Sequence, residues 1–332
     1  TISNNQALQG GGMRLVSSDP ILTNVTISNN TTSESGGMRL FNSNPILTHV
    51  TISNNTAEYY GGGMWLDYSD PILTHVTISN NTAEYYGGGM RLSNSNPILT
   101  NVTIANNTAN NSGGGMYLNY SNPTLTNVTF SGNTSGSKGG GMYLYSSSIN
   151  GSYVLITDNY SEGHGAGIFI GATSNMNLTK STIASNMVGE GDTFGAGIYA
   201  DGGTATLVNS IIYYNRREGD YGGNYNLNGY TMEILNEYTV SYSDIEGGES
   251  WIPEGDGNIS ITPEFNDFEN GDFTLQSTSP CIDEGDPESE LDPDGTRADM
   301  GAIYFHQTFG CTGESSCNYN PDANVDDGSC IY

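Results

Sequence analysis

Basic side chains are scarce in this chain. Of its 332 residues only 8 are lysine or arginine, whereas 36 are aspartate or glutamate, and the formal net charge is −28. Nucleic acids and anionic membrane surfaces are recognised through basic footprints. We therefore expect neither as a partner, and divalent cations are the more natural ligands.

Long apolar runs and dense charge are also missing. No apolar run approaches the ~20 residues of a membrane-spanning helix, and the first residues, TISNNQALQG, lack the regions of a signal peptide. With only 13% charged residues, a long solvated helix or coiled coil is excluded. We expect no membrane insertion, and a chain that is either mature or part of something longer.

What the chain does contain is a repeat of about 26 residues. The segment TISNN and its variants begin at Thr1, Thr26, Thr51, Thr77, Thr103 and Thr129. A second phrase, GGGM, keeps nearly the same step, with methionine at 13, 38, 64, 90, 116 and 142. Repeats of this length cannot bury their apolar side chains alone, so they are expected to stack.

Within each unit the apolar residues alternate, as in Met116-Tyr117-Leu118, which is typical of a strand with one buried face. Glycine, Asn/Asp-Pro and Thr-Asn separate three such strands, and three corners make a triangular coil. Stacked every ~4.8 Å, these coils form an all-β, single-stranded parallel β-helix (β-solenoid) of about ten coils. The tenth coil is expected near Gly248.

The predicted domains are a β-helix over 1–308 and a Cys/Asp-rich module over 309–332. Within the β-helix we expect regular repeats over 1–150, looser coils over 151–250, and acidic terminal coils or a cap over 251–308.

Three groups of phrases resemble known families. The GGGM and SNN phrases resemble repeats of polymorphic outer-membrane proteins and other bacterial right-handed β-helix surface proteins. The phrase at 279–305, SPCIDEGDPESELDPDGTRADMGAIYF, resembles the end of the β-helix in secreted proteins of marine and gliding bacteria. Residues 309–332 are similar to a short Cys-containing module that follows such domains. The resemblance implies a right-handed coil, secretion or display on a bacterial surface, and frequently adhesion.

The position between the inward methionine and leucine must point outward. Along the rod it is a column of planar groups: Arg14, Arg39, Trp65, Arg91, Tyr117, Tyr143, Phe169 and Tyr199. Such rings and guanidinium groups can stack on sugars or on a protein neighbour. The alternative is that large side chains simply shield a flat strand face. We interpret the column as a candidate ligand or assembly face, on an exposed side of the rod.

The acidic residues concentrate toward the C-terminus. Residues 1–150 hold 6 acids and 4 bases, whereas 244–332 hold 21 acids and a single base. Two loops there have oxygen ligands around a glycine, as Ca²⁺ prefers. The candidate ligands are Asp283, Asp286, Asp292, Asp294 and Asp299, and then Asp322, Asn324, Asp326 and Asp327. We expect structural calcium and no organic cofactor, the alternative being a solvated acidic surface.

All four cysteines, Cys281, Cys311, Cys317 and Cys330, lie in the last 52 residues. An even number in an acidic segment indicates two disulfides in an oxidising compartment, with three connectivities open. The resemblance to the Cys-containing module implies Cys311–Cys330, which would leave Cys281 with Cys317.

Catalysis is not expected, because near-identical coils offer no distinct active site. The regular coils show neither a basic residue beside a calcium loop, as a polysaccharide lyase needs, nor paired carboxylates, as a glycosidase needs. Arg297 is the one basic residue adjacent in sequence to a candidate calcium loop. We predict a non-catalytic extracellular component of a fibre or filament, formed by end-to-end or lateral association with its own copies or with flanking repeats. The alternatives are an adhesin that binds polysaccharide through the Arg/aromatic column, and a polysaccharide lyase or glycoside hydrolase.

Overall fold

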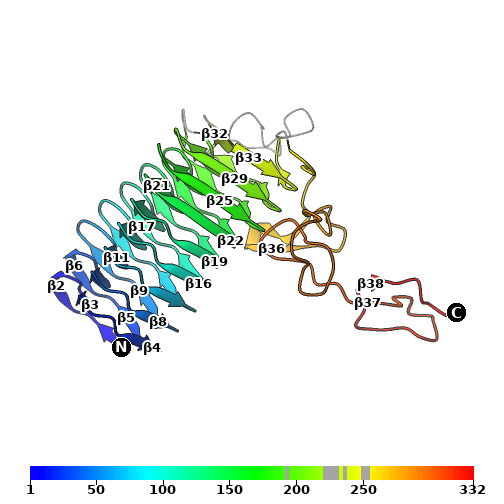
Figure 1. Ribbon diagram of the computed structural model, residues 1–332, viewed down its shortest axis with the longest axis horizontal. Helices are drawn as coiled ribbons and strands as arrows, with labels where there is room; N and C mark the ends of the chain where they lie inside the picture. The colour runs from blue at the N-terminus through cyan, green and yellow to red at the C-terminus, as the bar shows by residue number, and fades with distance from the viewer. Residues whose placement is uncertain (191–193, 220–231, 235–237, 248–254) are drawn as a thin grey trace.

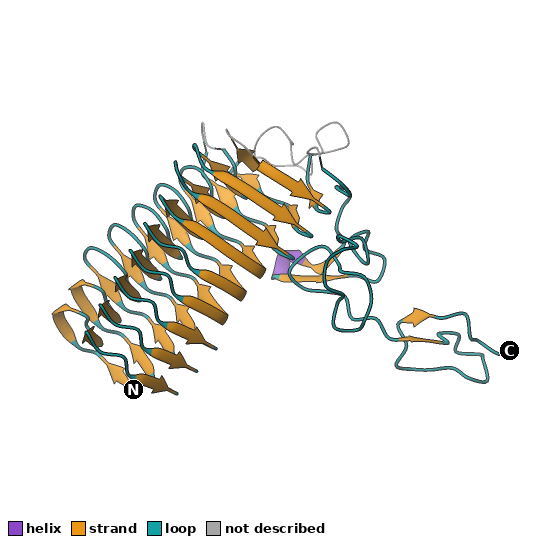
Figure 2. Ribbon diagram, in the orientation of Figure 1, coloured by secondary structure: helices purple, strands orange, loops and turns teal. Residues whose placement is uncertain are grey.

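The described part of the molecule is a rod of stacked coils followed by an irregular segment (Figure 1). The computed structural model describes residues 1–190, 194–219, 232–234, 238–247 and 255–332. Strands pair in parallel, coil on coil, in three long sheets. The helix among the described residues is one short 3-10 turn, η2 (Phe268–Asn270), visible in Figure 2. The predicted parallel β-helix is confirmed.

The first of these sheets, the methionine sheet, carries the GGGM phrase. It has nine strands: β3 (Met13–Val16), β7 (Met38–Phe41), β11 (Met64–Asp67), β15 (Met90–Ser93), β18 (Met116–Asn119), β21 (Met142–Tyr145), β24 (Ile168–Ile170), β28 (Ile198–Ala200) and β32 (Met232–Ile234). Identical positions pair from coil to coil, for example Met64 with Met38 and Met90. The sequence columns are therefore columns in space.

The second and third sheets follow the asparagine and threonine phrases. The short-strand sheet has β2 (Gln6–Gln9), β6 (Thr31–Glu34), β10 (Thr56–Ala57), β14 (Thr82–Ala83), β17 (Thr108–Ala109), β20 (Thr134–Ser135), β23 (Tyr160–Ser161), β27 (Met187–Val188) and β31 (Arg216–Arg217). The threonine sheet has β1 (Ile2–Ser3), β4 (Ile21–Thr23), β5 (Thr26–Ser28), β8 (Ile46–Thr48), β9 (Thr51–Ser53), β12 (Ile72–Thr74), β13 (Thr77–Ser79), β16 (Ile98–Ala105), β19 (Thr124–Ser131), β22 (Ser148–Thr157), β25 (Asn175–Thr179), β26 (Thr182–Ala184), β29 (Thr204–Val208), β30 (Ile211–Tyr213), β33 (Tyr238–Ser241) and β34 (Asp244–Ile245).

The number of coils can be counted from the stacked strands of the described residues. The methionine and short-strand sheets stack nine strands each, and the threonine sheet stacks ten at the position of the TISNN phrase, from β1 to β34, which agrees with the predicted number of about ten coils. Gly248, expected in the tenth coil, lies outside the described residues.

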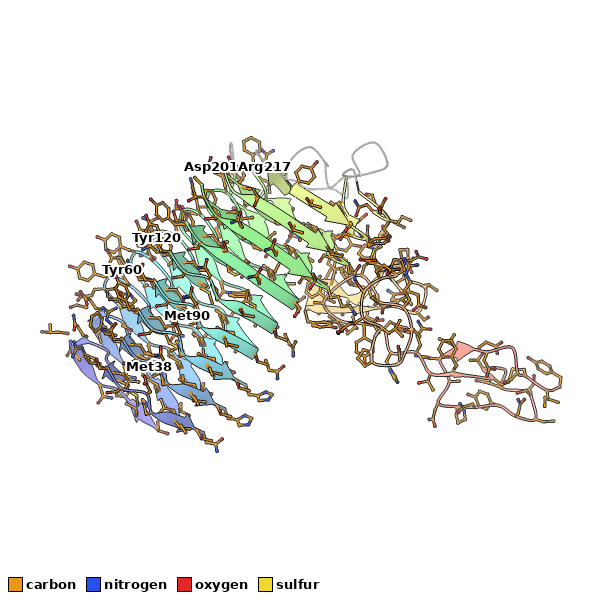
Figure 3. All side chains as sticks on the ribbon, viewed as in Figure 1. Met38, Tyr60, Met90, Tyr120, Asp201 and Arg217 are labelled. Carbon is orange, nitrogen blue, oxygen red and sulfur yellow. A yellow bond between two sulfur atoms is a disulfide. The ribbon has the colours of Figure 1, made fainter. Side chains whose placement is uncertain are left out.

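A continuous core runs inside the coils. The methionines of the central coils, for example Met38 and Met90, are fully buried (Figure 3). They share this core with the alternating leucines, valines and isoleucines of the other sheets. An unbranched thioether fills such a stacked interior without needing a polar partner, so the predicted packing role of this column is confirmed.

A column of asparagines forms the second structural feature of the coil. The backbone N and the Nδ2 of Asn81 both donate to Oδ1 of Asn107, at 3.0 Å each. The glycines lie directly beside this column, where a Cβ on Gly89 would approach the Gly115 oxygen to 2.5 Å and Asn107 Nδ2 to 3.0 Å. The third glycine of the phrase is therefore required by the close approach of the next coil's backbone and of the asparagine column.

The acidic segment packs against the side of the last coils as a cap. It contains an antiparallel pair, β35 (Phe265–Asp267) and β36 (Asp272–Leu275). Phe265, Phe273 and Met300 share a second buried cluster with Ile211 of the rod. The cap is followed by the C-terminal module, in which β37 (Phe309–Gly310) pairs with β38 (Val325–Asp326).

A buried carboxyl lies where the cap meets the rod. Asp244 is 0% exposed, accepts a hydrogen bond from the Ile261 backbone N at 3.1 Å, and lies 3.4 Å from the Cys281 sulfur. Burial raises the pKa of Asp244 to about 7, and the charge of Glu246 adds to this. The folded protein therefore holds a proton on Asp244 that the unfolded chain releases near pH 4.

We expect this group to make the protein less stable as the pH rises. Its stabilising contribution is full below about pH 4 and is lost as the pH rises through about 7, by up to ~1.4 kcal/mol per pH unit. Asp244→Asn, which keeps a neutral side chain of the same shape, should flatten the change in Tm between pH 4.5 and 7.5. An exposed control, Asp322→Asn, should leave the wild-type slope. Equal slopes in the wild type and Asp244→Asn would contradict the assignment.

Candidate functional site

The predicted column of planar groups exists as one column. The register pairs Arg14 with Arg39, Trp65 with both Arg39 and Arg91, and Tyr117 with Arg91. It then continues through Tyr143, Phe169 and Tyr199. We call these eight residues the strand column.

The expected exposure of the strand column was wrong. Arg39 is only 9% exposed and Phe169 only 2%. Of the other six side chains, Arg14 is exposed and five are half-buried. The reason is a second column that packs beside the first and covers it. It consists of the residue directly before the glycine phrase in six successive coils: Tyr60, Tyr86, Ser112, Lys138, His164 and Phe194. We call these six residues the loop column, and the two columns together the aromatic–basic face.

Sequence reasoning missed Lys138, His164 and Phe194 as members of this face. The signal was available, because each directly precedes the glycine that lies three residues before the next strand of the methionine sheet. In the structure these glycines have positive φ, for example 67° at Gly139 and 64° at Gly165. The turn they make places the preceding side chain over the strand column of the same sheet.

Cations and rings alternate tightly in the first half of the face. The Arg39 Cζ lies 3.3 Å from the centroid of the Trp65 ring. The Arg91 Cζ lies 3.9 Å from the Tyr60 ring and 4.7 Å from the Trp65 ring. Contacts of this kind hold a guanidinium group through the ring quadrupole, with no hydrogen-bond acceptor required.

The second half of the strand column is a stack of rings. Tyr117 and Tyr143 have centroids 5.0 Å apart with planes 2° from parallel, and Tyr143 and Phe169 repeat this at 4.9 Å and 1°. Burial raises the pKa of the Tyr117 and Tyr143 hydroxyls. Both hydroxyls therefore stay protonated at neutral pH and can donate a hydrogen bond to a ligand.

The face has many donors and few acceptors. Burial lowers the pKa of Arg39 and Arg91, an effect that Asp67 opposes at Arg39 through an ion pair of 3.1 Å. Within the described residues, Arg39 Nη1, Trp65 Nε1, Arg91 Nε and Arg91 Nη1 are buried with no hydrogen-bond acceptor. All four basic residues of the first 150 lie on this face, the fourth being Lys138.

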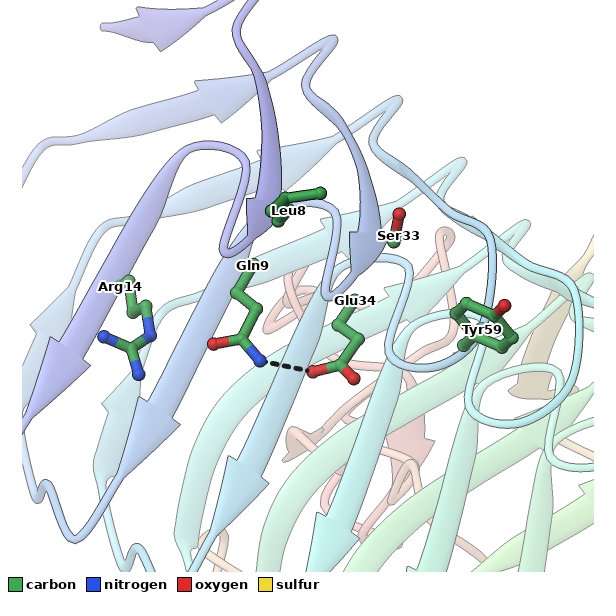
Figure 4. A pocket seen from close by; sticks show the side chains of 6 residues that line it. All are labelled: Leu8, Gln9, Arg14, Ser33, Glu34 and Tyr59. Carbon is green, nitrogen blue, oxygen red and sulfur yellow. Dashed lines mark hydrogen bonds between the residues drawn. The ribbon is translucent and has the colours of Figure 1, made fainter.

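A hollow with a volume of about 530 Å³ lies at the exposed end of this face (Figure 4). Arg14 and Tyr59 line it, together with Gln9, whose Nε2 donates to Glu34 Oε2 at 2.8 Å. Leu8 and Ser33 complete its lining. A basic group, an aromatic ring and polar side chains around one hollow suit a hydroxylated ligand.

In the first predicted calcium loop, the carboxylates accept hydrogen bonds from nearby backbone N–H groups and from Lys180. Asp292 accepts from Lys180 Nζ at 2.8 Å and from the Asp299 backbone N at 2.7 Å. Asp299 accepts from the Asp283 backbone N at 2.8 Å, and Asp294 accepts from the Gln307 backbone N at 2.7 Å. The Asp286 backbone N donates to Asn209 on the rod.

In the second predicted loop, which lies in the C-terminal module, side-chain oxygens also accept hydrogen bonds from the backbone. Asn324 Oδ1 accepts from the Thr308 backbone N at 2.7 Å, and Asp326 and Asp327 accept from nearby backbone N–H groups. Asp322 is exposed. Over the described ranges, no three histidine, cysteine or acidic side chains gather as a metal centre requires. Calcium at either loop stays a prediction.

Of the two expected disulfides, one is present. Cys311 and Cys330 are bonded with an S–S distance of 2.01 Å, which confirms the pairing implied by the resemblance. The pairing of Cys281 with Cys317 was wrong. Cys281 is fully buried in the cap, where burial raises the pKa of its thiol, whereas Cys317 is exposed in the module.

Comparison with known proteins identifies the fold. Residues 1–135 match the model of the right handed beta helix region. Among solved structures, the crystal structure of pectate lyase Pel9A superposes with a TM-score of 0.60, over 92% of this chain and 86% of its own, at 11% sequence identity. The chain shares the fold of a pectate lyase. No curated protein matches its sequence.

These comparisons correct one expectation and narrow another. The prediction that the chain is not an enzyme was wrong, because it took the near-identical coils of the β-helix as evidence against catalysis. The superposition covers 92% of this chain and 86% of the chain of a pectate lyase, which is an enzyme with the same fold. A parallel β-helix fold therefore does not argue against catalysis. The predicted right-handed β-helix is supported, whereas the narrower resemblances to polymorphic outer-membrane proteins and to the module of marine bacteria find no support.

Proposed function

We propose that this chain binds an acidic polysaccharide along the aromatic–basic face and cleaves it as a lyase outside the cell. The observation that carries the proposal is the concentration of basic groups. In a chain with a net charge of −28, all four cations of the first 150 residues lie on one face, interleaved with aromatic rings. Rings bind the apolar faces of sugars, and cations offset the carboxylates.

The fold agrees with this proposal, since pectate, the substrate in the name of Pel9A, is an acidic polysaccharide. In a β-elimination, a base removes the proton next to the sugar carboxylate, the glycosidic C–O bond on the adjacent carbon breaks, the sugar oxygen leaves and takes up a proton, and a C=C bond forms. A cation must stabilise the negative charge that develops on the carboxylate during this step. Arg91 and Lys138 are the cations that the face offers near its centre. The Cys311–Cys330 disulfide supports an oxidising, extracellular location.

The fibre and adhesin roles stay predictions, as do self-association and flanking repeats as partners. Among the described residues, no helix has the length and apolar character that crossing a membrane would take.

Removing a central cation tests the proposed function. We expect the wild-type protein to bind polygalacturonate and to release products that absorb in the ultraviolet because of their new C=C bond. Arg91→Met keeps the apolar stem but removes the charge, so binding should weaken about tenfold. Affinity electrophoresis in gels containing polygalacturonate measures the binding.

The matched control is Arg216→Met, which removes a charge from β31, where the paired residue of the preceding coil is Met187. It should bind as the wild type does. Wild-type protein that binds neither polygalacturonate nor alginate overturns the proposal, whereas binding without ultraviolet-absorbing products removes the lyase activity from it.

A further inference from the structure

The loop column changes its chemistry at two neighbouring coils. It begins with Tyr60, Tyr86 and Ser112 and then presents Lys138 and His164. The Lys138 Nζ lies 4.5 Å from the Phe169 ring centroid. The same backbone ladder that carries the column joins Gly139 N to the His164 oxygen at 3.2 Å. The side chains of Lys138 and His164 therefore extend from neighbouring coils, whose backbones are about 4.8 Å apart.

Rings hold both groups in place. The imidazole of His164 stacks on Tyr199 with centroids 4.5 Å apart, and Tyr199 in turn lies 5.5 Å from Phe169, the ring under Lys138. Lys138 and His164 thus pack on two neighbouring rings of the strand column, Phe169 and Tyr199. Asp201 lies directly after the end of β28, where it is exposed, and it is close enough for its charge to act on His164.

The structure fixes the tautomer of His164. The Phe194 backbone N donates to His164 Nδ1 at 3.0 Å, so Nδ1 is an acceptor and the neutral ring carries its proton on Nε2. Burial, and then the charge of Lys138, lower the pKa of His164, while Asp201 opposes them. At neutral pH the site therefore offers one cation and one neutral N–H donor.

In the part of the chain that the structure describes, Lys138, like Arg91, is held by an aromatic ring and not by a carboxylate. Arg39, Lys180 and Arg297 each have an acidic partner within 4 Å. Lys138, across the described residues, has an aromatic ring instead of a carboxylate. A cation left without a carboxylate in so acidic a protein can take its counter-charge from a ligand.

We propose that Lys138 and His164 form a subsite that binds the carboxylate of one acidic sugar unit, with Asp201 accepting from a hydroxyl of the same chain. Lys138 contributes the charge and His164 the Nε2–H donor. This inference rests on the proposed function, because it names the place where the bound polysaccharide is recognised as acidic. The inference assigns specificity for acidic sugars to the two coils that carry Lys138 and His164.

Two variants test the subsite while preserving the packing. Lys138→Met retains an apolar stem over Phe169, and His164→Asn retains an acceptor for the Phe194 N–H but lacks Nε2–H. Each should weaken binding of polygalacturonate about tenfold and leave binding of its fully methyl-esterified, neutral form unchanged. Lys138→Arg should restore most of the loss.

The outcomes separate this inference from the proposed function. If the wild type does not bind polygalacturonate, the proposed function fails. If the wild type binds and both variants bind equally well, only the subsite is overturned. Equal losses for the neutral polymer would show that the two side chains merely support the fold, and equal or tighter binding of dextran sulfate would overturn the assignment to a carboxylate.

Discussion

Asn107→Ala should destabilise the rod more than any exposed substitution, by about 3 to 6 kcal/mol. The side chain is fully buried, and its Oδ1 accepts from the backbone N and from Nδ2 of Asn81. Its Nδ2 donates to the Ile78 oxygen and to Asn133 Oδ1. Alanine removes all four bonds and leaves the Asn81 backbone N–H buried without a partner, at a cost of about 1 to 3 kcal/mol for each unsatisfied group.

Denaturant titration measures the loss in the free energy of unfolding. Amide hydrogen exchange shows which coils are destabilised, because a solenoid opens locally. Protection should fall most at Asn81 and its neighbouring coils. The control is Asn110→Ala, which removes one exposed bond to Glu84 and should change stability by less than about 0.5 kcal/mol. Equal effects of the two substitutions would show that the asparagine column does not stabilise the coil.

Lys180→Ala should release the cap from the rod, with a loss of about 3 to 5 kcal/mol. Its Nζ lies 2.8 Å from Asp292 Oδ1, and the two side chains are only 9% and 2% exposed. Removing the lysine leaves a charged carboxylate buried without a counter-ion. The backbone of residue 180 has a positive φ of 44°, which strains lysine and alanine alike, so the loss comes from the contacts of the side chain. These contacts are the ion pair and a hydrogen bond from Nζ to the Glu290 oxygen at 3.2 Å.

Limited proteolysis reports the release, because a detached cap exposes the chain between residues 255 and 308 to cleavage. Replacing both partners, Lys180→Met with Asp292→Leu, should recover most of the stability, since an apolar pair carries no unpaired charge. If Lys180→Ala resists proteolysis as the wild type does, the cap is held by its apolar cluster around Phe265 and Met300 instead.

One part of the candidate site could be predicted from the sequence, and another part could not. The strand column followed from the sequence alone, because stacking places equal positions of the repeat above one another, as the pairing of Tyr117 with Arg91 and Tyr143 shows. Its burial did not follow. Alternation says that Arg39 points out of the coil, but it does not say that a loop then covers it.

The sequence by itself determined the parallel β-helix, the inward methionines and the asparagine column. These depend on one physical condition, that each coil must match the coil above it, and a repeat records that condition directly. Only the tertiary structure decided that the loop column with Lys138 and His164 covers the strand column, that Cys281 is buried away from Cys317, and that Lys180 pairs with Asp292 across 112 residues. The loop column follows the period of the repeat, but a period does not say over which neighbours a turn folds. The contacts of Cys281 and Lys180 join segments outside the shared register, so no period in the sequence encodes them.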